Sequence, residues 1–367
     1  MAKIILMQWL ALILVLPYFW ILLSVYRGLK KINTFCPNKP GNQKISVIVA
    51  CRNESENIPL LLNDLAAQSY PPDLFEVIII DDNSSDNSYG IASSFGAIKN
   101  LTVLRNNGEG KKSAIRTGVI AAKGSLIITT DADCRIKTRW LETISSFSDS
   151  SGAVMIVCPV ILEEGKGFSG KFAELEFLSL QGVTAGTLAR GSGVMCNGAN
   201  LAFTREAYLS NMENIHTEIP SGDDVFLLHS MKNSGGLKIE WLESIEAVVR
   251  TSSPLSSGNF FRQRGRWISK ATAYNDTYTI ILGIVTFVTI LMMLIIPVAA
   301  LFDYTYIYVY FAILILKSIP DYLILGNTTE RYGKRKLMSW FLPSQFFYPI
   351  YVLISVFYGY ICRQKWH

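Results

Sequence analysis

The sequence predicts an α/β domain that apolar helices hold in a membrane, and two observations support this fold class. First, four long and mostly uncharged stretches have the roughly 20 apolar residues that a bilayer crossing requires: Ile4–Tyr26, Thr277–Phe302, about Tyr304–Leu325, and Leu337–Cys362. Second, the block between the first two stretches alternates β-branched runs with amphipathic segments. Hydrophobic residues make up 50% of the 367 residues and charged residues only 17%, which also indicates a membrane part.

Basic residues gather beside the apolar stretches, and this distribution predicts the orientation in the membrane. They are Arg27, Lys30 and Lys31 after the first stretch and Arg331, Lys334, Arg335 and Lys336 between the third and fourth. By the positive-inside rule both groups face the cytoplasm, together with the polar block. The basic tail 363–367 argues against a fourth full crossing, so three and four crossings both stay open. No A-x-A cleavage site follows the first stretch, so we expect an uncleaved anchor.

Other bulk features exclude some function classes. The net charge of +5 is small for this length and is not spread as a nucleic-acid footprint, so we expect no nucleic-acid partner. The six cysteines form no CxxC pair and no metal spacing, which predicts reduced thiols. The third apolar stretch contains Lys317 and Asp321, four residues apart. Ionisable groups inside a membrane segment indicate a functional site, but helical neighbours can also simply pair with each other.

The polar block reads as a series of strands and helices. KISVIVAC from Lys44 is a strand, and a helix opened by Asn53, Glu54 and Glu56 follows it. FEVIIIDD is a second buried strand that ends in acids, with a helix that begins near Ser85. NLTVLRNN is a third strand, GKKSAIRTGVIAAKG is helical by spacing, and SLIITTDADC is a fourth strand that ends in acids.

This alternation predicts a mostly parallel sheet, and ligands bind such sheets beyond the carboxyl ends of the strands. We therefore expect the acidic residues at the strand ends to line one crevice: Glu54, Asp81, Asp82, Asp131 and Asp133. The Asp131-Ala132-Asp133 pair supplies hard oxygen ligands that suit Mg²⁺ or Mn²⁺, particularly where substrate phosphates complete the coordination. Acids that only end a strand or form an Asx turn are the alternative for each of these positions.

Two further segments carry candidate chemistry. In GEGKKSAIRTG, Lys111 can place an ammonium beside a nucleotide or its diphosphate, although the pattern is not a P-loop. In HTEIPSGDDVFLLHSM, Asp223 and Asp224 precede an apolar helical run, where they can cap the helix or act as a general base toward an acceptor hydroxyl. His216 and His229 lie nearby, and we assign neither of them a role.

Four motifs together resemble a known family. IIIDDNSSD, TTDADC, SGDDVFLL and QRGRW, in this order, are similar to the motif set of membrane-integrated family 2 glycosyltransferases, in which a GT-A domain is followed by Q-x-x-R-W. That family includes cellulose, hyaluronan, chitin and poly-N-acetylglucosamine synthases and ceramide glucosyltransferases. The resemblance implies a GT-A domain over residues 44–270, an amino-terminal membrane anchor over 1–30 and two to three membrane helices over 277–362.

The resemblance also implies roles for single residues. Donor binding falls to Glu54, Asp81, Asp82, Lys111 and Asp131, and metal binding to Asp133 with Asp131. Asp224 matches the catalytic base and Asp223 its neighbour, which is a Glu in the usual family pattern. Gln263, Arg266 and Trp267 fill Q-x-x-R-W, so that Arg266 neutralises the donor diphosphate while the other two border the acceptor; Arg264 lies at a variable position. Cys196, Asn197 and Gly198 fall in a segment that resembles the acceptor loop.

The function that follows is metal-dependent transfer of a sugar from a UDP-sugar to a hydroxyl of a membrane lipid at the cytoplasmic face. A single base without a nucleophilic carboxylate predicts inversion and a β-linkage. A processive polysaccharide synthase is the alternative, with a growing glycan as acceptor and a channel or accessory subunit as an additional partner. A transporter whose cytosolic domain only senses a nucleotide belongs to a different class, and it would not need the complete set of acids.

Overall fold

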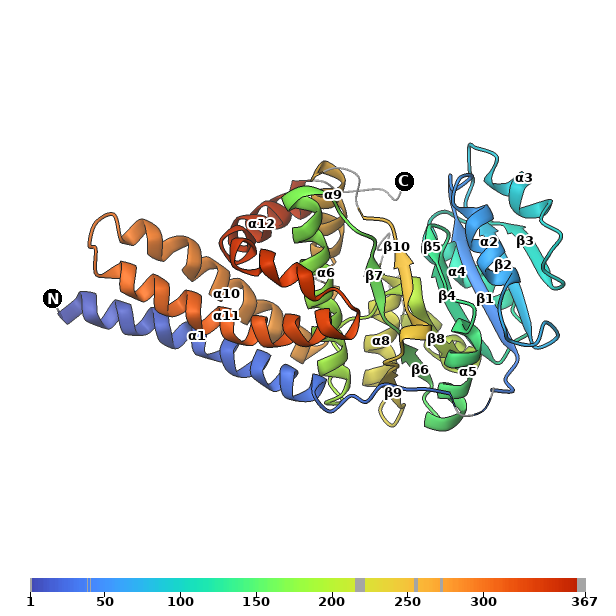
Figure 1. Ribbon diagram of the computed structural model, residues 1–367, viewed down its shortest axis with the longest axis horizontal. Helices are drawn as coiled ribbons and strands as arrows, with labels where there is room; N and C mark the ends of the chain where they lie inside the picture. Colours follow the sequence, from blue (N-terminus) through green and yellow to red (C-terminus); the bar gives the residue numbers. More distant parts are fainter. Residues whose placement is uncertain are drawn as a thin grey trace. The chain divides into compact units, whose positions relative to one another are not determined.

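The computed structural model describes residues 2–361 apart from 38, 40, 215–221, 254–256 and 271–272. Its contacts divide the chain into two compact units (Figure 1). The sheet unit comprises Ile32–Glu163 and Gly193–Ser252, and the helical unit comprises Met1–Lys31, Glu164–Ser192 and Ser253–Arg363. Residues 164–192 and 253–270 thus group with the apolar helices, whereas the catalytic-domain limits of 44–270 remain a prediction.

The sheet unit contains, within the described residues, a seven-stranded sheet of order β3-β2-β1-β4-β8-β6-β9. Its strands are β1 (Ile45–Cys51), β2 (Phe75–Asp81), β3 (Leu101–Arg105), β4 (Leu126–Asp131), β6 (Met155–Val157), β8 (Leu201–Thr204) and β9 (Ile239–Trp241). The neighbours from β3 to β4 are parallel, and β8 runs antiparallel to both β4 and β6. A smaller sheet has the order β5 (Cys134–Arg135), β10 (Val249–Thr251), β7 (Val160–Leu162). The four predicted strands are confirmed.

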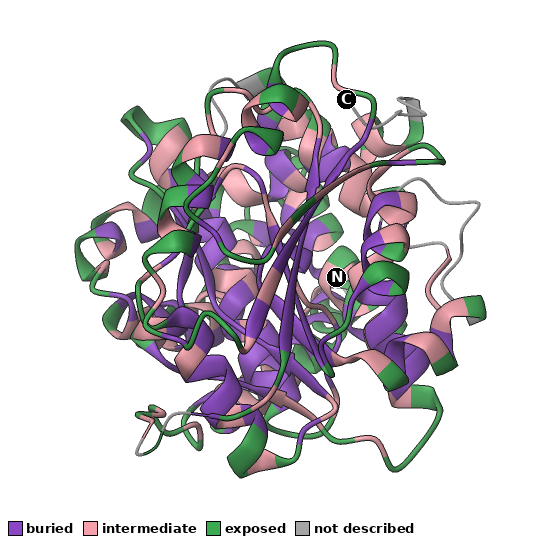
Figure 2. Ribbon diagram, turned by 90° about the vertical axis from the view of Figure 1, so that its right-hand side faces the viewer, coloured by how far each residue is buried: buried purple, intermediate pink, exposed green. Residues whose placement is uncertain are grey.

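The central strands are apolar because both of their faces are covered. Every residue of β1 is buried, and the strands of the sheet carry the colour of buried residues in Figure 2. Helix α4 (Lys111–Ala121) packs on one face through Gly118. A Cβ at Gly118 would lie 2.6 Å from Cγ2 of Ile48 and 2.8 Å from Cδ1 of Ile80, so glycine permits this close approach.

The remaining helices of the sheet unit correct two predicted helix starts. They are α2 (Ile58–Ala66), α3 (Ser88–Ser93), α5 (Trp140–Ser151), α7 (Arg205–Asn211) and α8 (Asp223–Asn233), with short 3-10 turns η1 (Gly198–Asn200), η2 (Met212–Asn214) and η3 (Ile245–Ala247). The first helix begins at Ile58, not among Asn53 and the acids after it, and the second begins at Ser88. Asn53 has a left-handed φ of 55°, and its side-chain oxygen accepts from the Ser85 amide at 2.8 Å. This hydrogen bond holds the two loops together, and both helices begin after it, later in the sequence than predicted.

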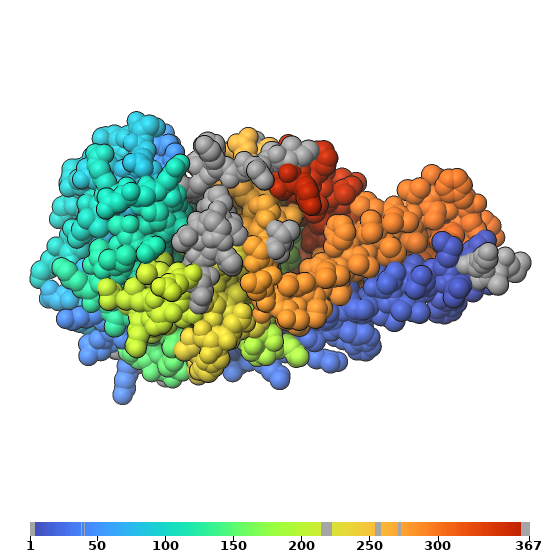
Figure 3. Space-filling view, turned by 180° about the vertical axis from the view of Figure 1, so that it is seen from behind, coloured from blue at the N-terminus to red at the C-terminus, as the bar shows by residue number. Residues whose placement is uncertain are grey.

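The helical unit contains α1 (Ala2–Leu29), α6 (Gly167–Leu188), α9 (Ser257–Ile268), α10 (Thr277–Ala299), α11 (Tyr306–Arg331), η5 (Arg335–Trp340) and α12 (Phe341–Ile361). Over the described part of the chain, four spans are long and apolar enough to cross a membrane: Ile4–Leu29, Thr277–Ala299, Tyr306–Arg331 and Arg335–Tyr360. They coincide closely with the predicted stretches. In Figure 3 the blue surface of α1 lies beside the orange surface of the segment that contains α10. Val15 of α1 and Met293 of α10 belong to one buried apolar cluster with residues of α11.

Helix α6 joins the helical unit through small residues. A Cβ at Gly28 of α1 would lie 2.3 Å from the carbonyl oxygen of Gly186, and a Cβ at Gly186 would lie 2.4 Å from that of Val25. A Cβ at Gly182 would lie 2.5 Å from the hydroxyl of Thr328 in α11. Gly182 and Gly186 form the small-xxx-small spacing that lets membrane helices approach closely. This packing explains why residues 164–192 group with the apolar helices.

The Lys317–Asp321 pair is satisfied inside the helical unit. The Lys317 ammonium lies 2.6 Å from Asp321 Oδ2 and donates to Gln345 Oε1 at 2.7 Å, and its side chain is only 1% exposed. Asp321 Oδ1 accepts from the Tyr18 hydroxyl at 2.7 Å. The alternative that these residues pair with each other is therefore confirmed, and the pair links α1, α11 and α12.

Candidate active site

The site begins at the carboxyl edge of the parallel strands. In the sheet register, Cys51 of β1 pairs with Asp81 of β2, and Ala50 pairs with Asp131 of β4. Asp81 and Asp131 therefore end the strands on the two sides of β1 at the same edge. This is the arrangement that the alternating sequence predicts for ligand binding in such sheets.

Lys111 lies close to acids from separate parts of the sequence. It is the first residue of α4, and its ammonium forms an ion pair with Asp131 Oδ1. Burial by itself lowers the pKa of Lys111, but the charges of Asp131, Asp223 and Asp224 outweigh that effect and raise it above its ordinary value. The predicted donor lysine, the first acid of D-x-D and the predicted base therefore lie close to one another.

Asp224 is held in a defined orientation beside this lysine. It lies in the first turn of α8, where Oδ2 accepts from the Gly198 amide at 2.9 Å and Oδ1 accepts from the Val225 amide at 2.8 Å. A Cβ at Gly198 would lie 3.6 Å from Asp224 Oδ2 and 3.8 Å from Lys111 Nζ. The carboxylate is partly exposed, so it stays accessible to a reacting hydroxyl. This geometry suits a base whose direction is fixed by backbone donors.

Asp133 supplies the second carboxylate of D-x-D. Its Oδ2 accepts from the Thr251 hydroxyl of β10 at 3.0 Å. Burial raises the pKa of Asp133 and the neighbouring Asp131 raises it further, while the Thr251 hydrogen bond and Lys111 oppose this. Repulsion between two such carboxylates fits a divalent cation, because the cation would offset it. No group of three His, Cys, Asp or Glu side chains that could hold a metal ion occurs among the described residues, so substrate phosphates or water would complete the coordination.

Glu54 faces the same acids from the loop after β1. Its amide donates to Ser88 Oγ at 2.7 Å, and its Oε2 accepts from Asn57 Nδ2 at 2.7 Å. Burial raises the pKa of Glu54 and the charges of Asp133 and Asp131 raise it further, although the Asn57 hydrogen bond opposes them. The expectation that Glu54 shares an edge with the D-x-D acids therefore agrees with the structure.

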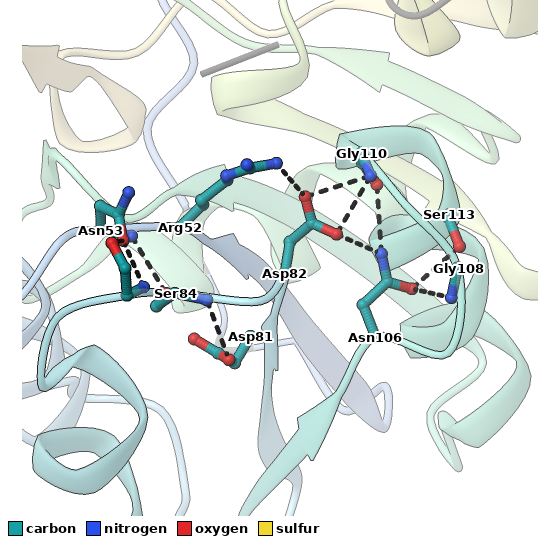
Figure 4. Close-up of polar contacts among 10 residues, drawn as sticks. Arg52, Asn53, Asp81, Asp82, Ser84, Asn106, Gly108, Gly110 and Ser113 are labelled. Carbon is teal, nitrogen blue, oxygen red and sulfur yellow. Dashed lines mark hydrogen bonds and ion pairs between the residues drawn. The ribbon is translucent and has the colours of Figure 1, made fainter.

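The Asp82 carboxylate accepts hydrogen bonds from groups of the chain itself (Figure 4). Its fully buried carboxylate accepts from Asn106 Nδ2 at 2.6 Å and from the Gly110 amide at 3.0 and 3.1 Å. Arg52 Nη1 lies 3.4 Å from its Oδ2. Gly110 has a left-handed φ of 88° and immediately precedes Lys111. In this structure Asp82 therefore shapes the turn that presents Lys111.

Asp81 differs from its neighbour in its hydrogen bonding. One oxygen accepts weakly from the Ser84 amide at 3.4 Å, while Oδ1 is buried and has no hydrogen-bond partner among the residues that the structure describes. A buried carboxylate oxygen without a donor is costly. Of the two acids that end β2, Asp81 thus has the free capacity for a ligand donor group.

Sequence reasoning missed Asn106 and Arg52, which hold Asp82. Asn106 directly follows the third strand, so a polar residue at a strand end was the available signal. Nothing in the local pattern singled out Arg52, because its partner is 30 residues away.

The predicted acceptor segment and the histidines have clear positions. Asn197 Oδ1 accepts from the Ala199 amide at 3.0 Å and so begins η1, Cys196 is partly exposed, and the Gly198 amide donates to Asp224 Oδ2. His229 is buried in α8 and its Nε2 lies 3.1 Å from the Val194 carbonyl, which indicates a structural residue. His216 lies outside the described residues.

The Q-x-x-R-W residues form one helix, α9, in the helical unit. Gln263 and Trp267 both contact Arg264: its Nη1 donates to Gln263 Oε1 at 2.8 Å, and its Cζ lies 4.1 Å from the Trp267 ring centroid. Arg266 is half-buried. The roles predicted for these residues at the diphosphate and the acceptor remain predictions.

A cavity of about 310 Å³ lies in the sheet unit at the opposite, amino edge of the sheet. Ile45, Phe75 and Leu101, the first residues of β1, β2 and β3, contribute to its wall. None of the predicted site residues lines this cavity. The chemistry described above therefore belongs to the carboxyl edge.

Comparison with known proteins agrees with this site. Residues 46–212 match the sequence profile of glycosyl transferase family 2. The matched region contains the predicted donor and metal acids and the acceptor segment, but it ends before Asp223, Asp224 and α9. This match supports a family 2 domain in this part of the chain, while the synthase subtypes named by the resemblance remain predictions.

Two curated relatives are sugar transferases by name. Over 114 residues the chain is 33% identical to glycosyltransferase AglE of Haloferax volcanii, and this alignment covers 30% of the chain and 38% of that protein. Over 95 residues it is 40% identical to the undecaprenyl-phosphate 4-deoxy-4-formamido-L-arabinose transferase of Photorhabdus laumondii, and this alignment covers 25% of the chain and 29% of that protein. The chain therefore matches well under half the length of these relatives.

Among solved structures, the mannosyltransferase PcManGT of Pyrobaculum calidifontis, in complex with GDP-Man and Mn²⁺, has a similar fold. The two chains have a TM-score of 0.60 and 18% identity over 96% of each. At this identity the similarity concerns the fold alone. The predicted fold class is confirmed: an α/β GT-A-like domain combined with apolar helices that could span a membrane.

Proposed function

We propose that this chain is a membrane-bound glycosyltransferase that transfers a sugar from a UDP-sugar to a hydroxyl of a membrane lipid at the cytoplasmic face. One observation carries the proposal. Lys111, Asp131 and Asp224 come from separate motifs, and the sheet unit brings them together with the Gly198 amide. A nucleotide sensor would need a cation near phosphate, but it would not need a directed carboxylate beside it.

The residues would divide the chemistry as follows. The Lys111 ammonium would attract the donor diphosphate, and Asp81 would accept from a donor group of the nucleotide through its free oxygen. Asp224, held by the Gly198 and Val225 amides, would take the proton of the acceptor hydroxyl as that oxygen attacks the sugar carbon. With one base and no nucleophilic carboxylate, the expected product has an inverted, β-configured linkage.

A divalent ion, Mg²⁺ or Mn²⁺, would stabilise the charge of the leaving diphosphate. Asp133 and Asp131 would hold it, as the chemistry of this carboxylate pair fits such an ion. The complex of PcManGT with GDP-Man and Mn²⁺ supports a donor of nucleotide-diphosphate type and a divalent metal. The choice of UDP rests on the family resemblance.

The lipid acceptor is supported by the four apolar spans and by the relative that is named for undecaprenyl phosphate. The predicted roles of Gln263, Arg266 and Trp267 at the diphosphate and acceptor, and of Cys196 and Asn197 in the acceptor loop, belong to the same proposal. A processive synthase would require a channel for its polymer, and four spans offer few helices for one.

The test uses the purified full chain in lipid nanodiscs with Mn²⁺ or Mg²⁺, radiolabelled nucleotide-sugars and total membrane lipid. Label on a discrete lipid in the organic phase supports the proposal and identifies the sugar. Label in a high-molecular-weight product would instead establish a polymer synthase. A protein that binds UDP but shows no label transfer and no nucleotide release with any donor would favour the sensing alternative. The Asp224→Asn variant, prepared in parallel, shows whether any transfer depends on this site.

A further inference from the structure

Helix α9 carries a buried ion pair on one face. The Arg264 side chain is only 2% exposed and forms a fork with Glu176 of α6: Nε lies 3.1 Å from both carboxylate oxygens and Nη2 lies 2.5 Å from Oε2. Glu176 Oε1 also accepts from the Tyr351 hydroxyl of α12 at 2.9 Å. Three helices of the helical unit thus meet at one pair of opposite charges.

The backbones of α9 and α12 approach closely beside this pair. A Cβ at Gly265 would lie 3.1 Å from the Gly359 amide nitrogen, and a Cβ at Gly359 would lie 3.0 Å from the Gly265 carbonyl oxygen. Close packing of two glycines fixes the distance between the helices but gives little resistance to rotation of α9 about its own axis, because glycine has no side chain to interlock. Resistance to rotation comes from the rings of Phe260 and Phe261, which lie against Tyr351 and Tyr358 of α12, and from the directional fork of Arg264.

The opposite face of α9 carries two other arginines. A helix turns by about 100° per residue, so Arg262 and Arg266 lie about 160° to 200° around the axis from Arg264. Arg262 is exposed and Arg266 is half-buried. Within the described part of the chain, neither guanidinium has an ion-pair or hydrogen-bond partner. Burial lowers the pKa of Arg266 and the charge of Arg262 lowers it further, which indicates that the two cations lie close together.

Uncompensated guanidiniums one helical turn apart are suited to bind a phosphate-containing anion, because each presents several N–H donors in a planar fork. We propose that the Arg264–Glu176 ion pair is a positioning contact that fixes the rotation of α9, so that Arg262 and Arg266 together face one phosphate-bearing ligand. The proposal rests on the proposed function for the ligand, which there is the donor diphosphate. It assigns Arg264 as a positioning residue and Arg262 as an additional binding residue.

The test removes both charges of the pair, because a single substitution would leave an unpaired buried charge and could unfold the protein. The double variant Arg264→Met with Glu176→Leu is compared with the double variant Lys317→Met with Asp321→Leu. The latter removes another buried ion pair of the helical unit, far along the sequence from α9, and serves as the matched control.

Three quantities are measured on the full-length proteins in nanodiscs: the thermal midpoint, the affinity for UDP with Mn²⁺ by calorimetry, and modification of Arg262 and Arg266 by phenylglyoxal, read by mass spectrometry. At thermal midpoints similar to the control, we expect the α9 variant to bind UDP at least tenfold more weakly and to show a changed ratio of Arg262 to Arg266 modification. The control variant should keep the wild-type values of both.

Wild-type UDP affinity and an unchanged modification ratio in the α9 variant would overturn the positioning role. Equal losses of UDP affinity in both double variants would show that the pair only stabilises the unit, which would also overturn it. Arg262→Gln should weaken UDP binding severalfold, and unchanged binding would remove Arg262 from the proposal. If the wild type binds no UDP, the proposed function fails, whereas the modification ratio still decides whether Arg264 sets the rotation of α9.

Discussion

The Asp82→Asn substitution tests whether the buried carboxylate shapes the turn before Lys111. Asp82 accepts from the Asn106 side chain at 2.6 Å and from the Gly110 amide at 3.0 and 3.1 Å, with Arg52 close by. Asparagine keeps one acceptor oxygen and places an NH₂ group where the other oxygen was, so a donor would face a donor.

The cost follows from the number of bonds lost. At least one charge-assisted hydrogen bond, worth about 1.5–3 kcal/mol, disappears and one buried donor is left unsatisfied, at about 1–3 kcal/mol. Their sum is about 2.5–6 kcal/mol. For a domain of about 150–250 residues, each kcal/mol lowers the thermal midpoint by about 2–4 °C, so the expected decrease is roughly 10 °C. Because Gly110 precedes Lys111, the KM for the donor should also rise about tenfold.

The assay combines a thermal melt of the solubilised protein with donor titration of the transfer rate. Asp73→Asn is the matched control, because it makes the same chemical change in an exposed ion pair, where Asp73 and Lys99 are 77% and 65% exposed. Exposed pairs contribute little, so this variant should melt and bind like the wild type. If Asp82→Asn melts within about 2 °C of Asp73→Asn and keeps the wild-type donor KM, the reasoning is wrong.

Four further predictions concern the site and the helical unit. Asp224→Asn should lower the transfer rate by about 10²–10⁴-fold with UDP affinity retained, and a wild-type rate would exclude Asp224 as the base. Arg266→Ala should reduce transfer by about 10²-fold or more while leaving the protein in the membrane fraction; loss of membrane association alone would favour a lipid-surface role. Removal of divalent ions with EDTA should stop transfer and added Mn²⁺ or Mg²⁺ should restore it, whereas full activity in EDTA would refute metal dependence. Lys317→Met should destabilise the protein by about 3 kcal/mol or more, because Asp321 would lose its buried partner; a melt like that of the wild type would contradict this role.

Some features of this protein follow from short-range sequence patterns alone. Continuous β-branched runs such as ISVIVAC and FEVIIID specify buried strands, and the acids that follow them fall at the carboxyl edge because parallel strands align their ends. Long apolar stretches specify the four candidate membrane spans, because length and hydropathy are also local properties of the sequence. The fold class and the line of acids could therefore be predicted.

Only the tertiary structure decided which of these side chains are occupied by contacts within the chain and which remain free for a ligand. Asp81 and Asp82 are equivalent in the sequence, but contacts with Asn106 and Gly110, 24 and 28 residues away, occupy Asp82 and leave an oxygen of Asp81 free. Arg264 stands at a variable position of its motif, yet its partner Glu176 is 88 residues away. Local periodicity determines which face of a strand or helix is buried, whereas the partner of a buried charge depends on segments that only the folded chain brings together.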